Sequence, residues 1–214
     1  MEAGASDHVW TMKKWCPFYT PMLESMPNMA DASPVQPIPE VYAVFAGPID
    51  QAGVQRIFNS LTTAIASRVG HVHLLFQSTG GGIGEGICVY NFFKALTVDL
   101  TLYNTGTVAS IAVIAFLGAK RRKTSAHAAF MLHRTQTTVQ FTNTEALKSL
   151  AESASLSDKR TEAILREYIN MPRRKWSQLD HNDLHISAEE AVQFGIAHQI
   201  AEFSPPPLTP IYNV

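Results

Sequence analysis

Ser110 stands where a serine hydroxyl could act as a nucleophile. It lies between a turn of small residues that starts at Thr105 and an apolar, helix-like run that continues to Ala115. A hydroxyl at the start of a helix is close to unpaired backbone N–H groups, and these groups and the helix dipole can stabilise developing negative charge. Serine is also common as a plain N-cap residue. Other motifs must therefore decide between a nucleophile and a cap.

A glycine-rich segment, Gln77–Gly84, follows a predicted strand and precedes a predicted helix. Without Cβ atoms, a backbone loop there can come close to another group. A nucleotide phosphate loop is the main alternative. The segment lacks the lysine and the following serine or threonine of a P-loop, however, and the spacing from Gly80 to Gly84 is not that of the dinucleotide fingerprint. No cofactor is therefore predicted.

The elements that would position these residues alternate between strands and helices. Strands are expected at Val41–Ala46, Val72–Phe76, Leu100–Tyr103 and Ala128–Leu132. Helical periodicity follows each of the first three strands, with Asp50 as the cap of the first helix and Ser110 at the start of the third. The short connections favour an α/β layer fold with parallel strands and right-handed crossovers.

The alternation ends after His133. The segment Arg134–Phe141 is rich in Thr, Gln and Val and is predicted to be extended. The segment Thr144–Ile169 has the periodicity of one long helix. A long helix that leaves an α/β core usually contacts a partner.

The C-terminal part is predicted to add a short helix and one strand. Ser187–Glu190 has the pattern of a capping box for a helix that ends at Gly195. A last strand is expected near Gln199–Phe203. The tail that begins at Ser204–Pro207 is rich in proline and is expected not to continue the sheet.

The composition favours one good core and argues against a nucleic-acid or membrane partner. The chain has 214 residues, of which 46% are hydrophobic and 16% are charged, and its net charge is −1. Nucleic acids and anionic membranes normally select for a strong basic excess. The basic runs Lys120–Lys123 and Arg173–Lys175 are therefore interpreted as solvated loops or surface ion-pair sites.

The location expected for this protein is the cytoplasm. Its N-terminus lacks the basic and apolar regions of a secretory signal, and its longest apolar run, Val108–Ala119, is too short to cross a bilayer. Cys16 and Cys88 are too few for a disulfide framework, which indicates a reducing compartment. Residues 1–40 contain several prolines and are expected to form an N-terminal extension.

Four segments in a fixed order resemble the proteolytic subunits of the Clp protease family. They are the glycine loop, Gly106–Ser110, Met131–His133 and Asp183–Gly195. Members of the family read Ser-Pro-Gly-Gly, Gly-x-Ala-Ala-Ser-Met, Met-Ile-His-Gln-Pro and Asp-x-x-x-Ser-Ala-x-Glu-Ala-x-x-Tyr-Gly-Leu at the corresponding points. The resemblance covers about residues 41–203. Each motif alone is moderately specific, and four in register are strong.

The resemblance implies a catalytic triad. Ser110 would be the nucleophile, His133 the general base, and Asp183 the residue that orients the imidazole and stabilises its cation. The backbone N–H groups of Gly81 and Ile111 match the family's oxyanion-hole positions, and each such donor is typically worth about 3 kcal/mol of transition-state stabilisation.

A second histidine and a second aspartate near these motifs are alternatives for the general base and its partner. His127 lies near the fourth strand but in a loop, whereas His133 directly follows the apolar run. Asp180 could replace Asp183, but only Asp183 has the right offset from Ser187. A metal site is not predicted, because a trio such as His181, Asp183 and His185 is usually a group of surface residues.

His71 and His73 alternate with apolar residues on the second predicted strand. This pattern is typical of hydrogen-bonded histidines in a core or an interface, and we interpret both residues in that way.

The resemblance also implies the architecture and assembly. The expected fold is the spiral ClpP/crotonase-like α/β core, with repeated β-β-α and β-α units and a projecting handle helix. The expected domains are an extension (1–40), a serine protease domain (41–203, with the handle at about 134–170) and a tail (204–214). Homo-oligomers are implied, as heptameric rings or tetradecamers, with peptides or unfolded proteins as substrates.

Some positions depart from the family pattern. Thr79 replaces a proline in the glycine loop, and Arg134-Thr135 replaces Gln-Pro after the histidine. The cleft that binds an AAA+ ATPase partner is aromatic in the family, but its matching positions here are assigned to His73, Leu75 and Ala95. We therefore expect an altered docking cleft.

Two other functions are compatible with the sequence. One is a catalytically silent scaffold or regulatory subunit that keeps the triad residues without assembling them. The other is a crotonase-type acyl-CoA enzyme, since that fold is shared and an oxyanion hole also stabilises enolates. The ordered Ser, His and Asp favour the serine endopeptidase.

Overall fold

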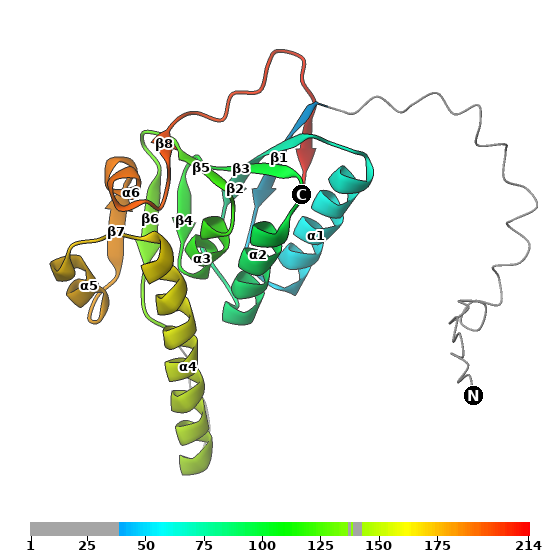
Figure 1. Cartoon of the computed structure of the whole chain (residues 1–214). Helices are drawn as coiled ribbons and strands as arrows, with labels where there is room; N and C mark the ends of the chain where they lie inside the picture. The colour runs from blue at the N-terminus through cyan, green and yellow to red at the C-terminus, as the bar shows by residue number, and fades with distance from the viewer. Residues whose placement is uncertain (1–38, 137, 139–142) are drawn as a thin grey trace, which may run out of the picture. The chain divides into compact units, whose positions relative to one another are not determined.

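A computed structural model describes the chain except for residues 1–38, 137 and 139–142 (Figure 1). The predicted N-terminal extension lies almost wholly outside these described residues, and Cys16 lies wholly outside them. In the described part of the chain, every helix is too short or too polar to cross a bilayer.

The main sheet contains six parallel strands within the described residues, in the order β8-β5-β3-β2-β1-β9. The strands are β1 (Glu40–Ala46), β2 (His71–Gln77), β3 (Asp99–Asn104), β5 (Arg121–Thr124), β8 (Gln199–Ile200) and β9 (Ile211–Asn213). From β1 to β8 the chain moves across the sheet in one direction, as expected for right-handed crossovers between parallel strands.

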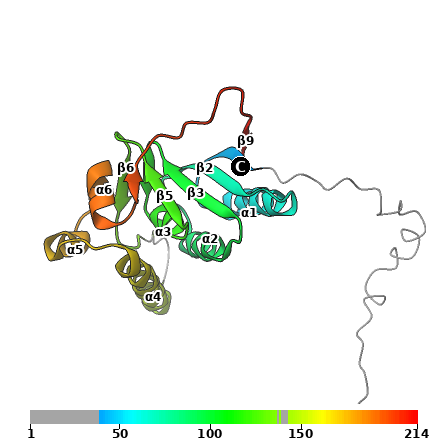
Figure 2. The same ribbon diagram turned by 45° about the horizontal axis from the view of Figure 1, so that its top comes forward.

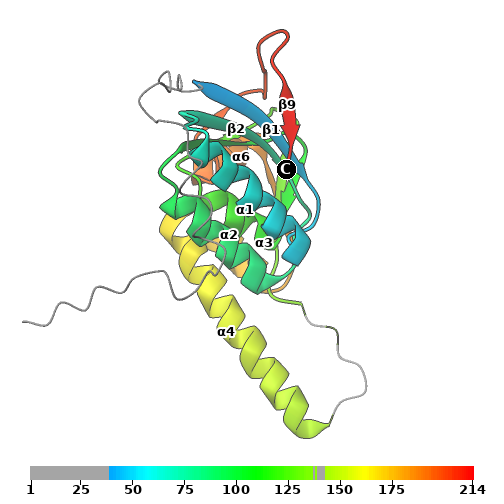
Figure 3. The ribbon, with the colours of Figure 1, turned by 90° about the vertical axis from the view of Figure 1, so that its right-hand side faces the viewer.

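One face of this sheet packs against helices. These helices are α1 (Gln51–Ala66), α2 (Ile83–Ala95) and α3 (Ile111–Leu117), and Figure 3 shows them side by side in front of the strands. Alternate residues of β2, such as Leu74 and Phe76, are fully buried under them, and the Phe76 ring contacts Phe93 of α2. All seven residues of α3 are buried, which explains its continuously apolar sequence.

The opposite face of the main sheet carries aromatic and polar side chains. Tyr42 and Tyr103 are buried there beneath Phe203, whose ring lies 5.7 Å from that of Tyr42 and 5.4 Å from that of Tyr103. Phe203 belongs to the C-terminal segment, which runs from β8 to β9 across this end of the sheet (Figure 2). The tail therefore covers part of the face that helices leave free.

A second, smaller sheet positions the predicted catalytic residues. In the described chain it has the order β4-β6-β7, formed by β4 (Thr107–Ala109), β6 (Ala129–Leu132) and β7 (Leu184–Ser187). Strands β4 and β6 are parallel, and β6 and β7 are antiparallel.

The remaining helices are α4 (Thr144–Tyr168), α5 (Arg173–Leu179) and α6 (Ala188–Phe194). The long helix α4 begins at the Asn143 cap and extends away from the sheets (Figure 1). Helix α6 begins with the predicted capping box of Ser187 and Glu190 and ends at Gly195 in the left-handed conformation. Both helices confirm the sequence pattern.

The C-terminal tail differs from its prediction. It does continue the sheet, because β9 pairs in parallel with β1 at Tyr42, Ala43 and Val44. The prolines of Ser204–Pro207 lie in the connection rather than in the strand, so they leave the backbone N–H groups of β9 available for pairing.

One basic run also differs from its prediction. Arg122 lies in β5 and is only 5% exposed, and its guanidinium donates to the carbonyl oxygens of Ala119, Gly195 and Ile196. A buried guanidinium needs such acceptors. The side chain therefore connects the end of α3 to the turn after α6 instead of facing solvent.

Candidate active site

The three predicted triad residues lie at one end of the second sheet. Ser110 directly follows β4, His133 directly follows β6, and Asp183 directly precedes β7. Because β7 is antiparallel to β6 and β4 is parallel to it, the end of β4, the end of β6 and the start of β7 occur at the same edge. The topology therefore brings together residues that are up to 73 positions apart in the sequence.

The strand register specifies this proximity further. The backbone N–H of Ser110 donates to the carbonyl of Met131 at 2.8 Å, which ties the serine to β6. On the other side Leu132 pairs with Leu184, and His133 and Asp183 are the next residues beyond this last pair.

The backbone of Ser110 is strained, and its hydroxyl is not a cap. The residue has φ 57° and ψ −132°, and its side chain makes no capping hydrogen bond to α3. A non-glycine residue in this region costs about 1–3 kcal/mol and persists only where the surrounding structure holds it. The plain-cap interpretation is therefore wrong, and the hydroxyl remains available for chemistry.

The glycine loop makes close contact with this serine. A Cβ atom on Gly80 would lie 2.7 Å from Cβ of Ser110 and 3.2 Å from its Oγ, and Gly80 has φ +107°. The loop is tied to β4 by hydrogen bonds from Ser78 N to Thr107 O and from Ala109 N to Ser78 O. The close backbone approach predicted from the glycines is thus directed at the candidate nucleophile.

The two proposed oxyanion donors point away from other acceptors. Ile49 pairs with the glycine loop through Gly80 O and Gly82 N, so the N–H of Gly81 between them faces the opposite way. Ile111 is the first residue of α3, and the N–H groups in a helix's first turn have no partner inside the helix. Among the described residues, neither N–H has an acceptor outside regular structure.

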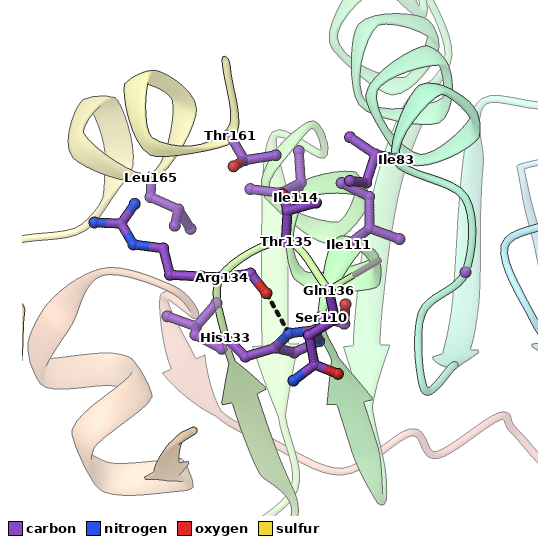
Figure 4. A pocket seen from close by; sticks show the side chains of 12 residues that line it. Ile83, Ser110, Ile111, Ile114, His133, Arg134, Thr135, Gln136, Thr161 and Leu165 are labelled. Carbon is purple, nitrogen blue, oxygen red and sulfur yellow. Dashed lines mark hydrogen bonds between the residues drawn. The ribbon is translucent and has the colours of Figure 1, made fainter. Parts of the chain in front are cut away.

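A small pocket joins these parts (Figure 4). Ser110, His133, Gly81 and Ile111 all line it, together with residues from α3 and α4 and the segment after β6. Its volume is about 90 Å³, which is space for a few water molecules.

Asp183, the predicted third member of a triad, is not engaged with the histidine. Nδ1 of His133 bonds to the backbone carbonyl of Arg134 at 2.6 Å, which Figure 4 shows as a dashed line. Asp183 is exposed and does not line the pocket. The carbonyl keeps the proton on Nδ1 and leaves Nε2 able to accept one, but it supplies no negative charge to stabilise an imidazolium.

Two carboxylates hold the side chain of Arg134. Its guanidinium donates to Glu162 of α4 at 2.7 Å and also contacts Asp180. The hydrogen bond from Arg134 lowers the pKa of the Glu162 carboxyl, and it does the same for Asp180. Both carboxylates therefore stay charged well below neutral pH and keep Arg134 between α4 and the end of α5.

Neither alternative residue enters the pocket. His127 is exposed in the loop before β6 and does not line the pocket, and Asp180 is engaged with Arg134. The geometry thus favours His133 over His127. Asp180 is paired with Arg134 and is therefore not assigned the role predicted for Asp183.

A substitution of Gly80 tests how strictly the loop positions Ser110. For the peptide hydrolysis predicted from the sequence, we expect Gly80→Ala to lower kcat at least tenfold. The variant should also destabilise the fold by about 1–3 kcal/mol, because the new Cβ displaces Ser110 and strains the positive φ. Thermal unfolding and peptide kinetics measure both effects.

The matched control is Gly84→Ala, at a helical glycine with no atom within 4 Å of the added Cβ. It should leave kcat unchanged and keep stability within about 0.5 kcal/mol of wild type or raise it. Equal behaviour of the two variants would contradict the close contact between the loop and Ser110.

The chain is similar to the proteins of one known family. The chain matches the family described as Clp protease over residues 38–204. The chain belongs to the Clp protease family. It is 24% identical over 156 residues to the ATP-dependent Clp protease proteolytic subunit 3 of Rhizobium etli, a match that covers 72% of this chain and 80% of the relative.

Further relatives support this membership at low identity. The ATP-dependent Clp protease proteolytic subunit of Oltmannsiellopsis viridis is 28% identical over 132 residues, which is 61% of this chain and 67% of the relative. Among solved structures, a mutant of ClpP1 from Listeria monocytogenes superposes with a TM-score of 0.66 at 19% identity, covering 75% of this chain and 91% of that chain. The predicted family and the ClpP-like α/β fold are confirmed.

The sequence did not reveal the role of Arg134. It appeared only as a departure from the Clp family pattern after the histidine, and its partners Glu162 and Asp180 are far from it in the sequence. An arginine in place of glutamine directly after a candidate base was the available signal.

Proposed function

We propose that this member of the Clp protease family is a serine endopeptidase that hydrolyses peptides or unfolded proteins. Ser110 Oγ attacks the carbonyl carbon of the peptide bond while His133 Nε2 accepts its proton. The tetrahedral oxyanion accepts hydrogen bonds from the N–H groups of Gly81 and Ile111. His133 then protonates the leaving amine, and water hydrolyses the acyl-enzyme by the same steps in reverse.

The observation that supports this proposal most strongly is the conformation of Ser110. Its strained backbone withholds the hydroxyl from the helix it begins, and the residue lines a pocket together with His133, Gly81 and Ile111. A structural serine at a helix start would normally cap that helix.

Asp183 is the proposed third member of the triad. The strand register supports this role, because His133 and Asp183 are the next residues beyond Leu132 and Leu184, the last pair of β6 and β7. For this contact to form, Nδ1 of His133 must leave the carbonyl of Arg134. Substrate binding is the step at which we place that exchange.

The assembly proposed is a homo-oligomer, as a heptameric ring or two stacked rings. Helix α4 supports it, because Leu147, Leu150 and Leu156 are 46%, 37% and 58% exposed on a helix that has only one buried residue, Leu165. Leu147 and Leu150 are three positions apart and share one side of α4, whereas Leu156 lies on another side, and adjacent exposed leucines favour contact with another surface. A second copy of α4 is the proposed cover.

An AAA+ ATPase is a proposed partner with an altered contact surface. His73 and Leu75 lie on the helix-free face of β2, whereas Ala95 ends α2 on the other side of the sheet. The three positions assigned to the cleft do not share one surface. We propose that the cleft of this chain that binds the ATPase lies on the helix-free face. It then includes His73 and Leu75 but not Ala95.

Labelling with a fluorophosphonate probe tests the proposed function. We expect the oligomeric fraction of the wild-type chain to form a covalent adduct at Ser110, located by peptide mass analysis, because the probe requires an activated serine. Ser110→Ala should not react.

A second candidate function makes the opposite prediction. A catalytically silent subunit is favoured by one observation, the bond between His133 and the Arg134 carbonyl in place of Asp183. It requires a well-folded oligomer that does not react with the probe and does not cleave peptides.

A further inference from the structure

Three potential metal ligands converge on the helix-free face of the main sheet. Glu40 of β1 and His71 of β2 are direct partners in the strand register, and His73 follows two residues later on the same side. One ligand atom from each of the three residues lies within 4.8 Å of the others. Within the described residues this is the group that converges, whereas the trio His181, Asp183 and His185 does not.

Neighbouring side chains orient both imidazoles. Tyr103 OH bonds to Nδ1 of His73 at 2.9 Å, and Nε2 of the same ring faces Glu40 at 3.2 Å. Thr101 Oγ1 bonds to Nε2 of His71 at 2.8 Å. In histidine metal sites, the nitrogen that does not bind the metal usually makes such a hydrogen bond, which fixes the tautomer and the ring direction.

The rings are also held by packing. The His73 ring stacks on Tyr42, with centroids 4.5 Å apart and planes 6° from parallel, and the two imidazole centroids are 4.0 Å apart. These contacts preorganise both rings.

We propose that Glu40, His71 and His73 form a binding site for one divalent transition-metal ion of the zinc class. Two imidazole nitrogens and one carboxylate oxygen are a recurrent zinc donor set, with a fourth position left for water. Ligand atoms about 2.1 Å from one tetrahedral ion are about 3.4 Å apart, so small side-chain rotations close the observed spacing. The site is separate from the peptidase pocket and does not rest on the proposed function.

Nearby positive charges lower the expected affinity for a divalent ion, but nearby negative charges offset them. Arg121 and Lys123 extend from β5 on the same face and repel a divalent ion. Arg121 is paired with Asp99 at 3.3 Å, and Lys123 lies over the Tyr103 ring. With Glu40 included, the fixed charges around the site nearly cancel.

The site connects the first residue of β1 to the centre of the sheet. Glu40 directly follows the segment that begins the chain, while His71 and His73 belong to a central strand. A bound ion would therefore fix the start of β1 against β2. We expect metal binding to raise the thermal unfolding temperature of the full chain.

Titration of the purified full-length chain with Co²⁺ tests the proposal, because Co²⁺ substitutes for zinc and reports its ligands by visible absorption. We expect one equivalent to bind per chain and to be displaced by Zn²⁺. Glu40→Gln and His73→Gln should each weaken binding at least tenfold. Tyr103→Phe, which keeps all three ligands, should weaken it about 10–100-fold by releasing the His73 ring.

His185→Gln is the matched control, since it removes a histidine from the other trio. It should bind Co²⁺ as wild type does, and thermal unfolding without metal establishes that each variant is folded. Absence of binding by the wild type, or wild-type affinity in Glu40→Gln, His73→Gln and Tyr103→Phe together, would overturn the proposal. Loss of binding in His185→Gln alone would assign the metal to the other trio and overturn it as well.

Discussion

Replacement of Ser110 by alanine is expected to lower kcat for hydrolysis of a small peptide by about 10⁶-fold. The hydroxyl is the only atom of this residue that can form the proposed acyl-enzyme, and the proposed oxyanion donors, the N–H groups of Gly81 and Ile111, should leave a small residual rate. KM should change little, because the substitution removes no contact with the rest of the peptide.

The proposed pairing of Ser110 with His133 gives a sharper expectation than the single variant. His133→Ala should lower kcat to nearly the same floor, and the double variant should fall no further, since the two residues act as one unit. Peptide kinetics on all three variants, with native mass as a check of assembly, measure this. Additive losses would show that the residues act separately.

His127→Ala is the control for this series. His127 is exposed and does not line the pocket, so its removal should leave kcat within twofold of wild type. A loss comparable to that of His133→Ala would move the general base to the other histidine and contradict the assignment.

The sequence could predict the parts of the site that depend on chain order. A strand precedes Ser110 and a helix follows it, and the apolar run directly before His133 is the strand β6. These features are local, so periodicity and turn residues determine them. The alignment of Asp183 with His133 could be expected only through the family resemblance, because no local pattern indicates that β7 pairs with β6.

Other features depend on contacts between distant segments and could not be predicted. The isolated bridge between Ser78 and Val108 and the short strands β4 and β5 are set by neighbouring strands rather than by their own sequences. The sequence of β5 is a basic run, which is typical of an exposed segment. Its Arg122 is nevertheless buried, where it donates to carbonyl oxygens after α6. Tertiary context overrides composition at such positions.

The C-terminal strand illustrates the same limit. Three consecutive prolines correctly indicate a break, but the three residues of β9 are too few to show a period of two. Their pairing is stabilised by the edge of β1 and by the bond from Arg56 to the terminal carbonyl of Val214. Neither of these partners is evident from the tail itself.

Asp183→Asn is expected to lower kcat by about 10⁴-fold while leaving the fold and KM nearly unchanged. The amide can donate to Nδ1 of His133, and this favours the tautomer with the proton on Nε2. That nitrogen then cannot accept the proton of Ser110. Asn also lacks the negative charge that stabilises the imidazolium during the reaction.

The resting contact of His133 makes this variant decisive. If the carbonyl of Arg134 held Nδ1 throughout the reaction, Asp183→Asn would cost less than tenfold, because the carbonyl already fixes the productive tautomer. A large loss therefore requires that Asp183 replace the carbonyl before Ser110 attacks.

Asp180→Asn is the control for Asp183→Asn. It removes a negative charge nearby without removing the carboxylate proposed to replace the Arg134 carbonyl at His133. Asp180 is three residues earlier and bonds to Arg134 rather than to the histidine, so its amide should change kcat less than tenfold. Measured together, a large effect at Asp183 and a small one at Asp180 would assign the imidazolium's counter-charge to Asp183. Similar losses in both would instead place the Arg134 contacts, and not a triad carboxylate, in control of His133.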